Sequence, residues 1–522
     1  MQRHFARHAL ARALHHAHWL VFIACFALYA CTLYPGVGGR AQWGDAAKWQ
    51  YIGSVLGISH PPGSPLYVLA TFAWGRLPIA TTIGARVILF SAVCGAGAVA
   101  LVFATLRTLG ARVGAALVGA GSLAIARALW TFSTEAEVYA PLALAIAFVV
   151  HRFVVWQAAR RVRDYAIGCA AYALAFGDHY LVLMLLPALL ALVLSSDARA
   201  AFRPRALAIV TLAILFGLVP FAWLWFQIPL ASYSEFPGAR SWRAFVDDLL
   251  VRQYRSGMFE GVHPERLLWA PRFALNQIGP GPGLLAALGV FALARDRARR
   301  PLALFFVLAA IAPLVFLAGY REGDDLGGVV AALVPMTVLV GLGMHWLVER
   351  LPWPRARDAA VAIALAVGAF GATVNARRLA VPDPLNHLTW EVDGVKAYRW
   401  DLPCVLRNAE TRVTIVPPFD DYGARQIVMY YETTDPDVGA KHVTFRYMGE
   451  APPSEWTWAR QPTMPAASEA RIVYAFQRGH ADRLASAGFA VEERTLDSLG
   501  GCGGGVVGPN ERKYFRAIPR PR

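Results

Sequence analysis

Charged side chains are scarce in this chain of 522 residues. Asp, Glu, Lys and Arg together make up 16% of the sequence, whereas an average soluble protein carries about 25%. Hydrophobic residues make up 57%, and the mean hydropathy is +0.42. They gather in blocks of about 20 residues, the length that crosses a bilayer and that a soluble core does not need. The composition therefore predicts a polytopic α-helical membrane protein.

Signatures of metal and phosphate binding are also missing from the sequence. The six cysteines show no metal-ligand spacing, and four of them, at positions 25, 31, 94 and 169, lie in apolar runs where cysteine behaves as a small hydrophobe. The glycine-rich stretch 500–505 lacks the Gly-Lys-Ser/Thr ending of a phosphate-binding loop. We therefore expect no cofactor and assign no metal ligands, and we leave metal dependence open.

The N-terminus resembles a targeting signal. Arg3, Arg7 and Arg12 precede an apolar run over residues 19–33, and no small-x-small cleavage site follows it cleanly. We predict an uncleaved signal anchor whose N-terminus lies in the cytoplasm.

The apolar runs predict about 11 membrane spans within residues 1–380. Their approximate bounds are 19–34, 83–106, 113–130, 138–156, 165–176, 180–194, 206–226, 271–293 and 359–374, with the ninth and tenth spans on either side of residues 321–325. The run 65–77 is apolar and aromatic but too short to span. We expect it to lie along the membrane interface or to dip into it.

Charge segregates across this topology. The connections predicted to face inward are short and rich in arginine, as cytoplasmic loops are. Topology therefore explains the formal net charge of +15, and we expect no nucleic-acid partner. The outward connections hold most of the acidic and histidine clusters: Asp45, His60, Glu135, Glu137, Asp178, His179, Asp324 and Asp325. This separation predicts an active site on the extracytoplasmic face of an integral membrane protein, for which we expect a bacterial inner membrane.

Residues 381–522 have a different pattern. Strand-like runs at 412–416, 426–431 and 471–476, a helix at 479–487 and a strand at 490–493 predict a small extracytoplasmic α/β domain. Cys404 and Cys502 are the only cysteines in this region, where oxidation can persist. We predict a disulfide between them, with two free thiols as the alternative.

The first outer loop carries the most distinctive polar residues. Asp45 lies a few residues beyond the first span, where a carboxylate can take a proton from an acceptor hydroxyl. His60 begins a His-Pro-Pro-Gly turn whose prolines stiffen the backbone beside the interfacial run. The alternatives are a solvated loop acid and a rigid turn with an incidental histidine.

The later outer loops add acids, an aromatic ring and an imidazole, at Glu135, Glu137, Tyr139, His179, Asp324 and Asp325. Each has a structural alternative. One glutamate can serve only as an acid at a helix N-terminus, where the dipole favours it. The histidine can be a packing residue, and the two aspartates can be loop acids.

Cationic and aromatic residues mark the long outer loop between spans seven and eight. Arg252, Tyr254 and Arg255 suit a phosphate group, because guanidinium groups pair with its oxygens in a fork. The alternative is an amphipathic interfacial helix with snorkelling arginines.

Three motifs resemble one family. Gly44–Gln50 followed by Leu56–Tyr67, then Glu135–Tyr139, then Gly177–His179 with Pro187 resemble the DUF2723 family of protein O-mannosyltransferase-like membrane proteins. The motifs cover spans one to six well and the later half loosely. The resemblance implies a GT-C glycosyltransferase fold that uses a polyprenyl-phosphate-linked sugar on the extracytoplasmic side, with Asp45 as the expected base.

The chain departs from that family pattern at two positions. Lys48 stands where the family usually has a glutamate, and Ser64 where it commonly has a tyrosine. A lysine three residues past Asp45 can pair with it and keep it ionised, or can face the donor phosphate as a point charge.

Two functions from different classes remain. The leading prediction is an inverting membrane glycosyltransferase that transfers a hexosyl or mannosyl group. It moves the sugar from a lipid-linked donor to an acceptor hydroxyl on protein, glycan or lipid. The C-terminal domain positions the acceptor. Its predicted catalytic residues are Asp45, His60, Glu137 and His179, and its predicted substrate-binding residues are Lys48, Glu135, Tyr139, Arg252, Tyr254, Arg255, Asp324 and Asp325. The alternative is a transporter or flippase for a lipid-linked sugar, which would place ionisable groups mid-span in broken helices with repeat symmetry. Here those groups lie at span ends, which favours the enzyme.

Overall fold

The computed structural model describes residues 17–34, 36–40, 43–236, 241–252, 264–320, 325–380, 402–416, 421–445, 472–495 and 513–520. The chain forms two compact units. The first comprises residues 1–33, 52–77 and 88–380, and the second comprises residues 34–51, 78–87 and 381–522. Residues 34–51 and 78–87 therefore cluster with the C-terminal region.

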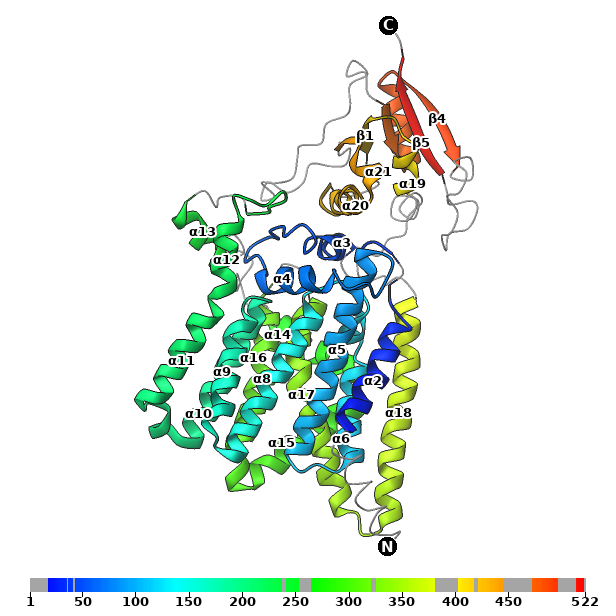
Figure 1. Cartoon of the computed structure of the whole chain (residues 1–522). Coiled ribbons are helices and arrows are strands. Elements are labelled where there is room, and N and C mark those ends of the chain that lie inside the picture. Colours follow the sequence, from blue (N-terminus) through cyan, green and yellow to red (C-terminus); the bar gives the residue numbers. More distant parts are fainter. Residues whose placement is uncertain are drawn as a thin grey trace. The chain divides into compact units, whose positions relative to one another are not determined.

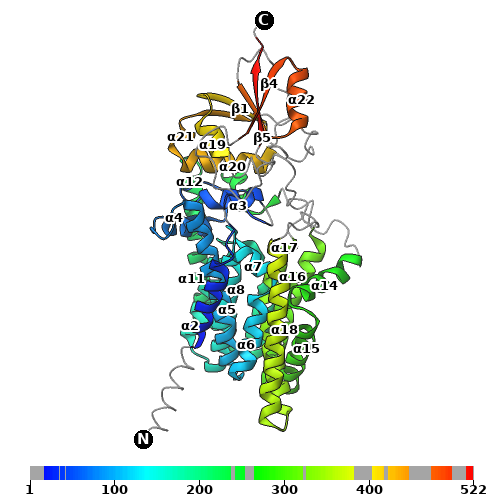
Figure 2. The same cartoon turned by 90° about the vertical axis from the view of Figure 1, so that its right-hand side faces the viewer.

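The first unit is a bundle of helices that run roughly side by side (Figure 1, Figure 2). Its elements are α2 (Ala17–Ala30), α4 (Pro65–Trp74), α5 (Ile83–Thr108), α6 (Val113–Ala124), α7 (Arg127–Ser133), α8 (Tyr139–Ala159), α9 (Val162–Ala175), η1 (Tyr180–Leu185), α10 (Leu186–Ala201), α11 (Pro204–Gly217), α12 (Val219–Gln227), α13 (Trp242–Leu249), α14 (Pro264–Ile278), α15 (Pro280–Arg295), η3 (Arg297–Arg299), α16 (Arg300–Gly319), α17 (Asp325–Arg350) and α18 (Pro354–Ala380).

The lengths of these helices fit a membrane domain. Among the described residues, seven helices are long and apolar enough to cross a membrane, and nine spans result if the bent pairs α6–α7 and α14–α15 each count as one. Two further predicted spans correspond to α2 and α9, which have 14 residues each. The total of about 11 spans stays a prediction.

α17 forms the centre of the bundle, and nearly all of its apolar side chains are buried. It packs against α15, α6, α16 and α8. The contact with α15 is backbone to backbone: a Cβ added at Gly343 would lie 1.8 Å from the carbonyl oxygen of Leu285. Small residues at such contacts let helices approach closely in a membrane. The result is a tightly packed scaffold for the loops at its ends.

Two predicted spans are broken rather than straight. α6 and α7 meet at a bend of 66°, and α14 and α15 at a bend of 107°. The second break falls in the Gly-Pro-Gly-Pro-Gly run 279–283, where Pro280 lacks an N–H and Gly279 has a φ of +88°. Gln277 Oε1 accepts a hydrogen bond from the backbone N of Ala128 at 3.0 Å, which links the two breaks. Non-helical backbone at membrane depth needs such partners.

The interfacial run after the His-Pro-Pro-Gly turn forms α4. This helix is apolar, has 10 residues and lies across the ends of the bundle helices (Figure 1). The backbone N of Leu66 donates to the carbonyl oxygen of Gly177 at 2.7 Å, which fastens the start of α4 to the loop after α9. The orientation agrees with the expectation that residues 65–77 do not span.

The second unit contains a mixed five-stranded sheet in the order β2-β1-β3-β5-β4. Its strands are β1 (Arg412–Val416), β2 (His442–Phe445), β3 (Ile472–Ala475), β4 (Phe489–Thr495) and β5 (Lys513–Pro519). β1 pairs in parallel with β2 and β3, and β5 pairs antiparallel with β3 and β4. The helices of the unit are α3 (Trp43–Tyr51), α19 (Leu402–Arg407), α20 (Asp421–Thr434), α21 (Pro436–Gly439) and α22 (Arg478–Ser486).

The α/β character of the C-terminal region is as predicted, with one correction. The expected strand at 426–431 is part of the helix α20. A short run rich in β-branched and aromatic residues does not distinguish a strand from a buried helix by its pattern alone. In the helix, Gln426, Met429 and Tyr430 share one face, and that face contacts α3 and Gly84, which lies in the segment 78–87 of the same unit.

Candidate functional site

Asp45 lies in the first turn of α3, with its partner one turn later. Lys48 Nζ is 2.6 Å from Asp45 Oδ1, and the exposed fraction of the side chain is 0% for Lys48 and 25% for Asp45. The ammonium also lies over the ring of Trp49, 4.7 Å from its centroid. The carboxylate is thus accessible, whereas the cation that balances it is fully buried. Of the two roles predicted for Lys48, the structure shows the contact that the pairing role requires.

The His-Pro-Pro-Gly turn is anchored to the long outer loop. Ile58 N donates to the carbonyl oxygen of Tyr233 at 2.9 Å, and Glu235 N donates to the carbonyl oxygen of Ile58 at 2.9 Å. The carboxylate of Glu235 then accepts from the backbone N of His60 at 2.7 Å and from the Tyr233 hydroxyl. Glu235 was not among the predicted site residues, because a single acid in a long loop carries no sequence signal.

The backbone of the turn is shaped for this position. Pro61 and Pro62 are joined by a cis peptide bond, and Gly63 has a φ of +92°. A Cβ at Gly63 would approach Leu224 Cδ2 to 2.8 Å, so the turn requires glycine both for its φ and for its fit against α12.

Glu135 and Glu137 lie between α7 and α8, Tyr139 begins α8, and all three are buried. The exposed fractions are 0% for Glu135 and 1% for Glu137. The ring of Tyr139 packs on Phe132 with centroids 4.7 Å apart and on His179 with centroids 5.2 Å apart. A Cβ at Gly327 would lie 2.2 Å from Tyr139 Cζ, so the ring rests on the backbone of α17. The structure thus brings Tyr139 and His179 together.

His179 is held as a neutral imidazole. Its Nδ1 accepts a hydrogen bond from the backbone N of Leu181 at 3.1 Å and caps η1. Burial, with a smaller contribution from His60, lowers the pKa of His179 to about 4. With Nδ1 engaged as an acceptor, Nε2 carries the proton and is a donor.

Asp178 is a buried acid that the predicted site residues left out. Its exposed fraction is 3%, and Oδ2 has no hydrogen-bond partner among the described residues. Burial raises the pKa of Asp178 well above its usual range. The sequence signal was available, since Asp178 belongs to the Gly-Asp-His motif and to the outward acidic cluster.

Of the remaining predicted site residues, two form ion pairs and three lie outside the described part of the chain. Asp325 pairs with Arg266 at 2.9 Å, and Arg252 pairs with Asp247 at 2.9 Å. Tyr254, Arg255 and Asp324 lie outside the described residues. Within the described part of the chain, no group of three or more His, Cys, Asp or Glu side chains could hold a metal ion.

The cysteines follow the expected division. Cys404 is disulfide-bonded, whereas Cys25, Cys31, Cys94 and Cys169 are free. The predicted partner of Cys404, Cys502, lies outside the described residues, so the pairing stays a prediction.

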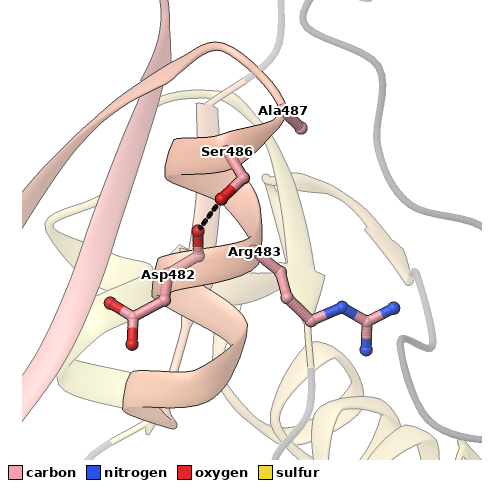
Figure 3. Close-up of a pocket in the computed structure, with 4 residues that line it drawn as sticks. All are labelled: Asp482, Arg483, Ser486 and Ala487. Carbon is pink, nitrogen blue, oxygen red and sulfur yellow. Dashed lines mark hydrogen bonds between the residues drawn. The ribbon is translucent and has the colours of Figure 1, made fainter.

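A surface hollow of the second unit lies on α22. It is lined by Asp482, Arg483, Ser486 and Ala487, and Ser486 Oγ donates to the carbonyl oxygen of Asp482 at 3.0 Å (Figure 3). These four residues are not among the predicted site residues. The hollow is open to solvent, and we assign it no part in the site.

Comparison with known proteins places the similarity in the N-terminal half. Residues 45–201 match the family described as "Protein O-mannosyl-transferase TMEM260 N-terminal domain". The protein O-mannosyl-transferase tmem260 of Dictyostelium discoideum is 23% identical over 253 residues, which cover 45% of this chain and 30% of the relative. Its counterpart TMEM260 of Mus musculus is 26% identical over 219 residues, which cover 41% of this chain and 30% of the relative. The matches thus span about a third of the length of these curated relatives.

Solved structures match along nearly the whole chain. The crystal structure of ArnT from Cupriavidus metallidurans bound to undecaprenyl phosphate superposes with a TM-score of 0.61 at 15% identity, covering 96% of this chain and 98% of that one. The apo oligosaccharyltransferase of Archaeoglobus fulgidus gives a TM-score of 0.51 at 14% identity, covering 82% of this chain and 64% of that one. The chain therefore has the predicted fold, a GT-C-type helical membrane domain followed by an α/β region.

Proposed function

We propose that this chain is a membrane glycosyltransferase that moves a sugar from a polyprenyl-phosphate-linked donor to an acceptor hydroxyl on the extracytoplasmic face. The observation that carries the proposal is the Asp45–Lys48 pair on α3, a partly exposed carboxylate beside a fully buried ammonium. It lies at the start of the region that is similar to O-mannosyl-transferases. ArnT, which shares the fold, was crystallised with undecaprenyl phosphate, a polyprenyl phosphate of the kind that the proposed reaction would release.

Asp45 is the proposed general base. Its carboxylate takes the proton of the acceptor hydroxyl as the acceptor oxygen forms a bond to the anomeric carbon. The bond from that carbon to the phosphate oxygen breaks on the opposite side, and its electron pair stays on the departing polyprenyl phosphate. Displacement from the opposite side inverts the anomeric configuration. Lys48 favours the ionised form of Asp45, which is the form that accepts a proton.

The other predicted residues receive roles in the same step. We propose that His179 donates a hydrogen bond through Nε2, because its Nδ1 is already engaged with the backbone. Sugar hydroxyls would be oriented by Glu135, Glu137 and Tyr139. His60, whose backbone N is held by Glu235, would contribute its imidazole to the catalytic step. Arg252, Tyr254 and Arg255 would hold the lipid phosphate, and Asp324 and Asp325 would contact the acceptor. The acceptor is a hydroxyl of protein, glycan or lipid.

The test uses the full-length chain in membranes and undecaprenyl phosphate mannose labelled in the sugar. We expect label to move into a protein, glycan or lipid fraction in a chain-dependent manner, with release of undecaprenyl phosphate. If the label stays on its lipid, and the chain instead speeds movement of that lipid across liposome membranes, the enzyme proposal is refuted and the flippase alternative is supported.

A further inference from the structure

The helix that carries Asp45 is held by the C-terminal region of the chain. α3 is a polar helix, yet residues 46–51 are each at most 2% exposed. α20 is the element of the second unit that α3 packs against most extensively, and the two helices lie side by side in both views (Figure 1, Figure 2). Ala46, Ala47 and Tyr51 recur at helical spacing, but the polar side chains of Lys48 and Gln50 are buried with them. Polar contacts therefore help to fix the position of α3 beside the apolar packing.

A buried hydrogen bond joins the two helices. Tyr51 Oη donates to Gln426 Oε1 at 2.8 Å and lies 3.6 Å from Met429 Sδ. Tyr51 is 0% exposed and Gln426 is 1% exposed. A buried hydroxyl that loses its acceptor bears the desolvation penalty of an unsatisfied group. The bond therefore favours one position of α3 relative to α20.

The same face of α20 contacts residues 78–87, the other segment that clusters with the C-terminal region. Tyr430 lies one turn after Gln426, and its hydroxyl is so close to Gly84 that a Cβ there would be 2.9 Å away. On the N-terminal side, Gln50 Nε2 donates to the carbonyl oxygen of Gly36 at 2.7 Å. α3 is thus fixed at its C-terminal end by α20 and tied to the loop that precedes it.

We propose that α20 positions the catalytic carboxylate, with Tyr51 and Gln426 as positioning residues. This inference rests on the proposed function, in which Asp45 is the base. Asp45 and Tyr51 belong to one helix and are separated by less than two turns, so a shift at Tyr51 is transmitted to Asp45. A misplacement of about 1 Å can cost about 100-fold in rate. The C-terminal region would then act on the base, whereas the sequence predicted that it acts on the acceptor.

The experiment measures transfer from undecaprenyl phosphate mannose by the full-length chain in membranes. Tyr51→Phe and Gln426→Leu each remove the bond with little change in volume. We expect each to lower kcat about five-fold or more while the donor KM changes less than about two-fold, because the binding groups stay in place. The double variant should be no slower than the slower single variant, because both substitutions remove the same bond.

Tyr474→Phe is the matched control. Tyr474 Oη donates to Glu410 Oε2 at 2.8 Å in the same unit, but from β3 rather than α3. We expect this variant to keep kcat within about two-fold of the unmodified chain. Hydrogen exchange supplies a readout that needs no substrate: the amides of residues 43–51 should exchange faster in Tyr51→Phe and at the original rate in Tyr474→Phe.

Four results would overturn the proposal. Equal losses of kcat in Tyr51→Phe and Tyr474→Phe would assign the bond to general stability. Unchanged exchange at residues 43–51 in Tyr51→Phe would show that the bond does not hold α3. If Asp45→Asn is inactive while Tyr51→Phe is normal, only the positioning role fails, whereas an active Asp45→Asn variant removes the base and the positioning role together.

Discussion

Replacing Asp45 by asparagine should abolish most of the transfer. Asparagine keeps the size of the side chain and cannot accept the proton of the acceptor hydroxyl. A positioned general base contributes about 10²–10⁴-fold, or about 3–5 kcal/mol of barrier. We therefore expect kcat to fall by at least about 100-fold, with a smaller change in the donor KM.

The structure adds a stability cost to this substitution. Lys48 is 0% exposed and pairs with Asp45 at 2.6 Å. Removing one member of a buried ion pair costs about 3–5 kcal/mol, since the other charge stays buried. The cost here should be lower, because Asp45 is 25% exposed and the ammonium keeps its contact with Trp49. The double variant Asp45→Asn with Lys48→Met removes the buried charge as well and should recover the lost stability.

The assay compares these variants at matched abundance in membranes. Transfer of labelled mannose from undecaprenyl phosphate mannose is measured for the unmodified chain, for Asp45→Asn and for the double variant. If the double variant is as abundant and as thermally stable as the unmodified chain but inactive, the defect is chemical. Transfer by Asp45→Asn within about ten-fold of the unmodified rate would refute the assignment, because a base cannot be worth so little.

Four further predictions follow from the described residues and the topology. Lys48→Ala should shift the pH dependence of kcat, whereas a rise in donor KM alone would assign Lys48 to the phosphate. Burial lowers the pKa of His179 from about 6.5 in the unfolded chain to about 4 in the folded one. The neutral imidazole is therefore compatible with full stability above about pH 6.5, and stability is lost as the pH falls towards 4, because the unfolded chain binds the proton first. His179→Gln should flatten this part of a plot of Tm against pH. A reporter fused after Arg205 should read cytoplasmic, and an external signal would break the span assignment. Alkylation before and after reduction should reveal two additional thiols, at Cys404 and Cys502, and full labelling before reduction would exclude the disulfide.

The membrane domain was largely predictable from the sequence, because span length and arginine placement reflect the bilayer directly. The described helices α5, α8, α16, α17 and α18 coincide with predicted spans. The breaks were not predicted, although the Gly-Pro-Gly-Pro-Gly run at 279–283 carried the signal for one of them. Hydropathy averages over a window and therefore does not register a bend within it.

The candidate site was predictable in its motifs and unpredictable in its contacts. Asp45 and His179 were selected because they belong to short motifs, and the Asp45–Lys48 contact follows from three-residue spacing on a helix. The anchoring of His60 by Glu235 depends on a bond between residues 175 positions apart. The position of α3 depends on a hydrogen bond between Tyr51 and Gln426, which are 375 positions apart. No local pattern encodes such pairings, and the expected strand at 426–431 concealed the helix that provides the second.

The lysine at position 48 changes the electrostatics of α3 as a whole. In the family that the motifs resemble, a glutamate at this position would set two carboxylates one helical turn apart, a pair that repels a phosphate and attracts a cation. Here the same turn carries one carboxylate and one ammonium, so its net charge is zero rather than −2. At an effective dielectric of about 20, a unit charge 4 Å from another is worth about 4 kcal/mol, so a change of two units would alter the interaction of α3 with the proposed anionic donor. The buried position of Lys48 makes this change permanent, because its ammonium cannot turn away into solvent and leave Asp45 unbalanced.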